Sequence, residues 1–295
     1  MRVPNLPDLK AAALSVVRRG PRTVLWTSDL FGFGNVLYGW LRAHARQAAG
    51  DDTVALLTAT GARWLPLLDG RADALVVRRP EVGLTDRREP GAPFVFGEDF
   101  TRGQLESFLD DVVLPSSLSD PTAATLLHPD DVVVVVRRGD YWSVPEFRSR
   151  YAFDTDSYLR AALALQEEAG GPIGRVHVVS DGLGWCRAHL GWLADGGRRL
   201  TFATADQTPR DHFATMVGAR RLVVTNTTFG YWGGYGATRR HGEGSIVVAP
   251  RFHARGIPRG ERAVNLDPRW SIVETIAGGW VEPPPSPDDR PGPGP

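Results

Sequence analysis

Short apolar runs that end abruptly at polar residues recur along this chain, and stretches with helical spacing of apolar residues separate them. The clearest run is the valine stretch 132–136, which is followed directly by Arg137. An uninterrupted apolar run bounded by turn residues is typical of a strand buried on both faces, as in a parallel sheet. Alternation of such strands with helices predicts an α/β fold. We expect strands at 22–28, 53–58, 74–78, 131–136, 175–180, 199–203, 221–225 and 245–249, and helices at 35–49, 103–113, 155–168, 183–194, 209–218 and 228–237.

The alternating pattern is interrupted between 115 and 129, where Ser, Pro and Asp are frequent and no periodicity is strong. We therefore predict two Rossmann-like, doubly wound parallel-sheet domains, over 1–120 and 121–280, which face each other across a cleft. The last residues, 281–295, are rich in Pro and nearly devoid of apolar side chains, and we expect a disordered tail there.

Composition limits the binding partners and the cellular compartment that we expect for this protein. Lys+Arg and Asp+Glu are both 34, so no net charge draws the chain to nucleic acid or to acidic membranes. No run of 18 uncharged apolar residues predicts a transmembrane helix, and no cleavable leader is evident, so we expect a cytoplasmic protein. The single cysteine, Cys186, excludes an internal disulfide and is expected to be a small core residue.

Two arginines follow the valine run at the end of a predicted buried strand. Ligands of doubly wound sheets lie beyond the carboxyl ends of the strands, and a guanidinium matches phosphate oxygens through its planar fork. Arg137 and Arg138 are therefore candidate phosphate ligands. Gly139 permits a tight turn, and Asp140 is suited either to orient an arginine or to accept a proton. The alternative is a surface arginine pair in salt bridges with nearby aspartates.

A second candidate anion site lies where the strand 221–225 gives way to a helix. Unpaired amides and the positive end of the dipole at a helix start favour phosphate, and the hydroxyls of Thr227 and Thr228, next to Asn226, would add donors. The alternative is a plain N-cap, a role for which Thr and Asn are well suited. The strand 175–180 likewise ends at Ser180 and continues into Asp181, which either binds a ribose or base edge or caps the next helix.

Two weaker motifs complete the candidates. Gly32-x-Gly34-Asn35 after the first strand is half of a dinucleotide fingerprint and would shape a loop facing the cleft. Asp154-x-Asp156 is an arrangement that holds a divalent metal in many glycosyltransferases, but it precedes a strong helical pattern, where acidic residues cap the helix and complement its dipole. We favour the cap. The seven histidines show no zinc spacing, so no metal site and no cofactor are predicted.

Taken in order, these segments resemble the α-1,2-fucosyltransferases, glycosyltransferase family 11, over about residues 23–250. The family's H-x-R-R-G-D-Y hallmark corresponds to residues 135–141, although Val135 stands in place of the histidine. The G-x-G-N-Q loop corresponds to residues 32–36, with Val36 in place of the glutamine. The remaining blocks, S-D-x-x-x-W-C and a D-x-x-x-M helix running into a strand and an N-S-S-F type turn, correspond to residues 180–186, 211–216 and 225–232.

The resemblance implies a GT-B-like fold and transfer of L-fucose, or a related sugar, from a GDP-sugar to a hydroxyl of a glycan or small-molecule acceptor. It implies inversion without metal, with the acceptor on the N-terminal domain and the donor on the C-terminal domain. Arg137 would contact the donor diphosphate and stabilise the departing GDP. The predicted site consists of Arg137, Asp140 and Glu146 as catalytic residues, the last two as candidate general bases, and of Gly32, Gly34, Asn35, Arg138, Ser180, Asp181, Asn226, Thr227 and Thr228 as substrate-binding residues.

The two departures from the family pattern, Val135 and Val36, leave the donor sugar, the acceptor and the linkage open more than the fold. Three alternatives follow. The first is a transferase with another nucleotide-sugar donor, and the second is a non-catalytic relative that binds a nucleotide or glycan. The third is a metal-dependent enzyme that uses Asp154 and Asp156.

Overall fold

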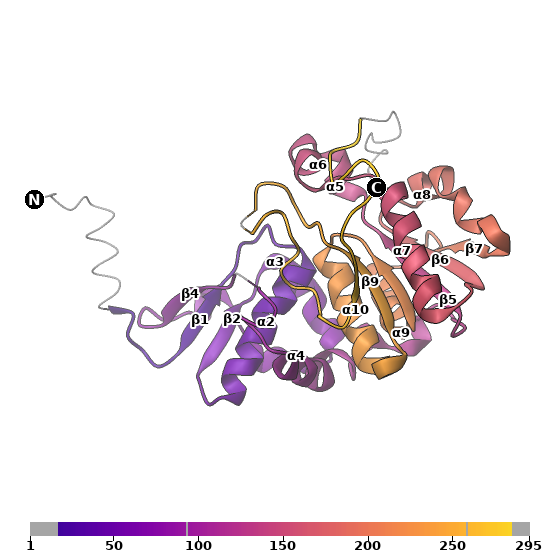
Figure 1. Ribbon diagram of the computed structural model, residues 1–295. Helices are drawn as coiled ribbons and strands as arrows, with labels where there is room; N and C mark the ends of the chain where they lie inside the picture. The colour runs from indigo at the N-terminus through magenta and orange to yellow at the C-terminus, as the bar shows by residue number, and fades with distance from the viewer. Residues whose placement is uncertain (1–16, 93, 258, 285–295) are drawn as a thin grey trace, which may run out of the picture. The chain divides into compact units, whose positions relative to one another are not determined.

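The computed structural model describes residues 17–92, 94–257 and 259–284, and it divides into two compact units between Ser117 and Leu118 (Figure 1). Each unit is built on its own sheet, and the strand pairs of both sheets are parallel. The predicted fold class, two α/β units with parallel sheets, is confirmed. The predicted tail lies outside the described residues from 285 onward. Within the described ranges, no helix is both long enough and apolar enough to cross a membrane.

The first unit contains a four-stranded sheet in the order β3-β2-β1-β4. Buried side chains of the inner strands, such as Val24 and Leu56, form its apolar centre. The last strand, RREP, was not predicted because its charged and mostly exposed residues carry no apolar signal. The strands are β1 (Thr23–Trp26), β2 (Thr53–Leu56), β3 (Val76–Val77) and β4 (Arg87–Pro90).

The helices of the first unit begin where the sequence offers cap residues. Thr58 accepts a hydrogen bond from the Gly61 amide at the start of α3, and Thr101 forms a capping box with Gln104 at the start of α4. The helix expected at 103–113 is present but changes to a π-helical turn in its second half. The helices are α2 (Phe33–Ala48), α3 (Ala59–Trp64) and α4 (Arg102–Phe108), followed by the π-turn Leu109–Val113.

The second unit contains a six-stranded sheet in the order β10-β9-β8-β5-β6-β7. From β5 the chain winds outward through β6 and β7, then returns to the other side of β5 and continues through β8, β9 and β10. The strand order therefore reverses between β5 and β8, as in a doubly wound sheet. The strands are β5 (Asp131–Val136), β6 (Arg175–Ser180), β7 (Arg199–Phe202), β8 (Arg221–Val224), β9 (Ile246–Pro250) and β10 (Ser271–Val273).

Helices cover this sheet, and their apolar faces form the larger core. Leu159 and Leu163 of the helix predicted at 155–168 are buried against the valines of β5, and Cys186 is fully buried beside them, as expected. The helix expected at 183–194 instead ends at His189 and continues as a 3-10 segment that contains a non-helical Gly196. The helices are α5 (Gly139–Ser143), α6 (Pro145–Tyr151), α7 (Thr155–Gly170), α8 (Leu183–His189), α9 (Pro209–Gly218) and α10 (Thr228–His241). Short 3-10 turns lie at Leu65–Leu68, Asp73–Leu75, Arg79–Glu81, Ser117–Ser119, Pro121–Ala123, Gly191–Gly197 and Gly242–Gly244.

Helix α10 lies unusually close to α9 because glycines stand where other helices carry side chains. A Cβ added at Gly233 would lie 2.7 Å from the side chain of Met216, and one added at Gly236 would lie 2.7 Å from that of Val217. This close packing fixes the position of α10 against α9.

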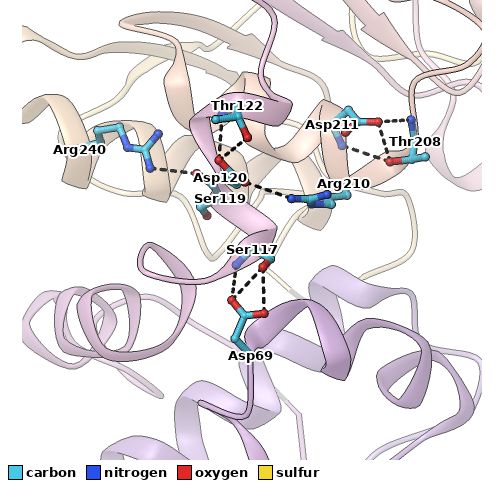
Figure 2. Close-up of polar contacts among 9 residues, drawn as sticks. All are labelled: Asp69, Ser117, Ser119, Asp120, Thr122, Thr208, Arg210, Asp211 and Arg240. Carbon is cyan, nitrogen blue, oxygen red and sulfur yellow. Dashed lines mark hydrogen bonds and ion pairs between the residues drawn. The ribbon is translucent and has the colours of Figure 1, made fainter.

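Polar contacts hold the chain on each side of Leu118 (Figure 2). Within the first unit, the Asp69 carboxylate accepts hydrogen bonds from the Ser117 amide at 2.7 Å and the Ser117 hydroxyl at 2.9 Å. Within the second unit, the Arg240 guanidinium donates to the Ser119 carbonyl at 3.1 Å. Ser117 and Ser119 are thus each held by contacts within their own unit.

Candidate functional site

Three loops follow neighbouring strands of the second sheet at the point where the strand order reverses. Arg137 follows β5, Thr225 follows β8, and Asp181 follows β6. The backbone amide of Arg137 donates to the Thr225 hydroxyl at 3.1 Å, which joins the first two loops directly. In open parallel sheets this is the place where ligands bind. The segments that sequence analysis assigned to an anion therefore share one sheet edge.

The Arg137 guanidinium is held between two carboxylates. It donates to Asp140 at 2.5 Å and to Asp181, and its side chain keeps 34% of its surface exposed. Burial lowers the pKa of Arg137, but the charges of Asp181 and Asp140 raise it, and the net shift is upward. The guanidinium is thus oriented, charged and accessible.

Asp181 organises both arginines. One of its oxygens accepts from the Arg137 guanidinium, and the other accepts from the backbone amide of Arg138 at 2.7 Å. The helix that follows has Gly182 as its N-cap, without a side-chain cap bond, so Asp181 does not serve as that cap. Sequence reasoning offered ligand binding or capping for Asp181 and missed this orienting role, because the contact spans more than forty positions.

Two glycines allow these loops to approach. Gly139 has φ +27°, and a Cβ there would collide with the Asp181 carboxylate. A Cβ at Gly182 would lie 2.5 Å from the Cβ of Arg138. Real Cβ contacts are not that short, so a side chain at either position would push the Arg137–Asp181 pair apart.

The amino end of α10 forms the other side of this edge. Its N-cap, Thr227, makes no side-chain cap bond, Thr228 is its first residue, and no acidic residue lies in the first turn. The amides of that turn, with the positive end of the helix dipole, favour an anion. Thr227 therefore occupies the N-cap position, but its side chain does not cap the helix.

Asn226 and Ser180, both predicted to bind substrate, also have partners within the protein. The buried Asn226 amide donates to the carbonyls of Tyr151 at 2.9 Å and His253 at 2.7 Å. The Ser180 hydroxyl accepts from the Gly182 amide at 2.9 Å. Both side chains support the loops that carry the charged groups, and their role as ligands stays a prediction.

A small, partly open pocket of about 200 Å³, including space shared with solvent, lies at this edge of the second unit. Tyr141 and Tyr151 stack at 4.2 Å along its aromatic wall. The enclosed part of this space is only about 10 Å³, roughly the room that one water molecule needs, so the pocket marks where the loops converge and is not by itself large enough for a nucleotide. The lining residues are Arg137, Tyr141, Trp142, Tyr151, Ala152, Phe153, Thr155, Thr225 and Asn226.

The two candidate general bases differ in their placement. Asp140 lies beside the pocket and is bonded to Arg137, with 44% of its side chain exposed. Glu146 is exposed in the first turn of α6 and does not line the pocket. Tyr141 is not suited to be a base, because burial raises the pKa of its phenol well above the ordinary value.

The glycine loop of the first unit occupies the corresponding position in its own sheet. Gly32, at the end of the loop after β1, is the N-cap of α2, and its carbonyl accepts from the Asn35 amide at 3.0 Å. Gly34 is buried in the first turn of that helix. Since β1 lies between β2 and β4, this loop also stands where the strand order reverses. The structure does not assign it a ligand.

Asp154 is a helix cap, as expected. Its carboxylate accepts from the Ser157 amide at 3.1 Å and from the Ser157 hydroxyl at 2.6 Å, at the start of α7. Burial raises the pKa of Asp156 in the same turn. Over the described ranges, no three His, Cys, Asp or Glu side chains gather in a way that could hold a metal ion.

Comparison with known proteins identifies relatives of this chain. Residues 119–265 match the model of the family described as Glycosyl transferase family 11, a stretch that contains β5 to β9 and the three loops above. The galactoside alpha-(1,2)-fucosyltransferase 1 of Homo sapiens is 34% identical over 109 residues, which are 35% of this chain and 28% of that protein. The enzyme of the same name from Aotus azarae is 28% identical over 140 residues, 46% of this chain and 35% of that protein. The chain thus matches about a third of the length of these curated relatives.

Among solved structures, E. coli heptosyltransferase WaaC with ADP aligns with 88% of this chain and 95% of its own. The TM-score is 0.43 and the sequence identity is 10%.

Proposed function

Because the chain is a divergent glycosyltransferase whose residues 119–265 form a glycosyl transferase family 11 domain, we propose that it transfers L-fucose, or a related sugar, from a GDP-sugar to a hydroxyl group. The resemblance found in the sequence is confirmed at the level of the family. The donor, inversion at the anomeric carbon and independence from metal belong to the proposal, as does a glycan or small-molecule acceptor.

One observation carries the proposal: Arg137 and the amino end of α10, which has no side-chain cap and no acidic residue in its first turn, follow adjacent strands at the point of strand reversal. In the proposed reaction, the acceptor oxygen attacks the anomeric carbon from the face opposite the diphosphate. The bond from that carbon to the diphosphate oxygen breaks, and its electron pair leaves with GDP. Arg137 and the α10 amides stabilise the charge that develops there, and such stabilisation is often the largest catalytic contribution.

This arrangement supports a reaction without metal, because a guanidinium and a helix dipole can supply the positive charge that a divalent cation would otherwise provide. Asp154, half of the rival Asp-x-Asp motif, is engaged as a helix cap. We therefore propose that Arg137 and the helix start at Thr227 and Thr228 stabilise the negative charge of the leaving group.

The proton of the acceptor hydroxyl requires a base, for which Asp140 and Glu146 remain the candidates. Asp140 is beside Arg137, whereas Glu146 would need a substrate that reaches α6. We propose that the acceptor is bound by the first unit, and that Gly34 and Asn35 of the loop after β1 contribute to binding of the donor.

The two departures from the family pattern are both buried. Val135 lies within β5, paired with Val179 and Val224, and Val36 lies on the buried face of α2. Each apolar side chain is compatible with its core, so the departures alter potential ligand contacts without disturbing the fold. A changed donor or acceptor is consistent with them.

Isothermal calorimetry with GDP, UDP and dTDP tests the donor, followed by assays of GDP release from GDP-fucose with and without acceptors. We expect GDP to bind most tightly and release to continue in EDTA. Tight GDP binding without release under any condition would indicate a non-catalytic relative. Preference for UDP or dTDP would identify another donor, and loss of turnover in EDTA would indicate a metal-dependent enzyme.

A further inference from the structure

The second arginine of the pair is enclosed between two indole rings. The Arg138 guanidinium carbon lies 3.4 Å from the centroid of the Trp142 ring and 3.8 Å from that of Trp185. The two ring planes are inclined by only 26°, with centroids 6.3 Å apart, so the planar guanidinium is stacked between them. Arg138 is 4% exposed.

This stack joins two loops that follow adjacent strands. Trp142 belongs to α5, after β5, and Trp185 belongs to α8, after β6. On its outer side Trp185 stacks on His189 at 4.6 Å. The same two loops are joined by the Asp181 carboxylate, which accepts from the Arg138 amide and holds the Arg137 guanidinium.

The two arginines are therefore in opposite situations. Arg137 lines the pocket and is about one-third exposed, whereas Arg138 is buried and is absent from the pocket lining. Stacking on aromatic faces is a favourable use of a guanidinium, and it is strongest where water is excluded. For Arg138 to reach a phosphate, it would have to leave both rings.

We propose that Arg138 is a positioning residue: its stack between Trp142 and Trp185 holds the Asp181 carboxylate, and through it Arg137, in place for the donor diphosphate. The Arg138 side chain itself does not contact the phosphates. The identification of the ligand as a donor diphosphate rests on the proposed function, but the positioning role of Arg138 does not.

Variants that remove the stack without removing charge distinguish positioning from direct binding. Trp185→Leu leaves both arginines intact at a position outside the pocket lining, and Arg138→Lys keeps the charge but loses the planar stack. We expect each to raise the calorimetric Kd for GDP by about tenfold, which corresponds to a modest loss of interaction energy. Trp185→Phe should retain most of the affinity. A direct phosphate ligand would keep its guanidinium in Trp185→Leu, so a Kd within about twofold of the wild type in that variant would overturn the proposal.

The Arg160–Trp192 pair provides a matched control. The Arg160 guanidinium lies 3.9 Å from the Trp192 ring, in the same unit, between α7 and the 3-10 turn after α8. Trp192→Leu breaks a contact of the same kind, so it should lower thermal stability comparably while changing the GDP affinity less than about twofold. A tenfold weaker GDP affinity in this control would mean that any broken stack weakens binding, and the proposal would fail.

A double-mutant cycle shows whether the stack acts through Arg137. In the Arg137→Ala background, Trp185→Leu should have no further effect on the Kd for GDP. If Trp185→Leu weakens binding by the same factor in both backgrounds, Arg138 acts independently of Arg137 and the inference is wrong.

A second cycle requires no nucleotide. Trp142→Leu and Asp181→Asn are combined, and chemical denaturation is followed; if the stack holds Asp181, the double variant should lose less than the sum of the single losses. Additive losses would overturn the positioning role. If the wild type binds none of the three nucleotides while this coupling is present, the proposed function fails and the positioning role stands.

Discussion

The two sheets repeat one strand order but place different chemistry at the same edge. The order β3-β2-β1-β4 of the first unit has the same sequence of windings as β7-β6-β5-β8 of the second. After β5 comes an arginine pair held by carboxylates, whereas after β1 comes a glycine loop whose Leu30 is 94% exposed. The sheet topology thus determines where the loop after β1 or β5 lies. The few residues of that loop determine whether it presents charged side chains. We expect the two edges to respond very differently to matched substitutions.

The largest difference is expected for Arg137→Ala. Removal of one preorganised charge donor typically lowers turnover by about 100- to 1,000-fold, and we expect such a loss in GDP-sugar turnover with a native circular dichroism spectrum. Arg88→Ala, which removes an exposed guanidinium from β4 of the first unit, is the matched control and should leave turnover within about threefold of the wild type. Turnover of Arg137→Ala equal to that of the wild type would remove the distinction between the two edges.

A pair of glycine substitutions compares how tightly each loop is packed. Gly182→Ala would place a Cβ 2.5 Å from Arg138, whereas a Cβ at Gly32 would meet nothing within 4 Å. Denaturant unfolding should show a loss of about 1–3 kcal/mol for Gly182→Ala, as for other overpacked sites, and a change within about 0.5 kcal/mol for Gly32→Ala. Equal losses would mean that the loop of the first unit is as constrained as that of the second.

The pH dependence of stability should arise mainly in the second unit. Burial lowers the pKa of His177 and of His253 to about 4, below the ordinary value for histidine. Between about pH 6.5 and pH 4 the unfolded chain therefore binds more protons than the folded chain, so stability falls as the pH falls through this range. Hydrogen exchange followed by mass spectrometry at pH 7 and pH 5 should show faster opening of β6 and of the segment around His253 at pH 5. His177→Gln should flatten this dependence, and an unchanged slope would contradict the assignment.

The smallest difference is expected for helix caps, which the two units use alike. Asp154→Ala removes the cap of α7 in the second unit, and Thr101→Ala removes that of α4 in the first. Each should cost about 0.5–2 kcal/mol in thermal or denaturant unfolding. Asp154→Ala should otherwise leave turnover unchanged in EDTA and in magnesium. A strong, magnesium-dependent loss of turnover would restore the metal-binding interpretation of Asp154.

Much of the fold could be predicted because long apolar runs and helical periodicity dictate burial directly. The valine strand at 131–136 and the helix after Asp154 are examples. Two strands were missed for physical reasons: β4 is charged and exposed, and β10 has only three residues. The helix expected at 183–194 ends at His189, just before Leu190 and Gly191, and the 3-10 segment that follows leaves helical geometry at Gly196, φ +74°.

The candidate site was predictable only in part. That Arg137 and Thr225 meet follows from adjacent strands ending at one edge, which a parallel sheet guarantees. The contact partner of each side chain could not be predicted in this way. That Asp181 holds Arg137, and that Trp185 stacks on Arg138, depends on contacts across more than forty positions that no local pattern encodes. Tyr151, which lines the pocket, was missed because an aromatic residue at the end of a short helix has no distinctive signal.

The glycine-lined side of α10 limits how this protein can be altered. Gly233 and Gly236 leave no room for larger side chains. Packing in the middle of α10 therefore determines where the amino end of the helix lies. Ligand preference can be changed by substitutions at the amino end of α10, but Gly233 and Gly236, which pack against α9, must be kept. Libraries that randomise the whole helix would consist largely of clones whose tip is displaced, so diversity is best confined to the positions before Gly230.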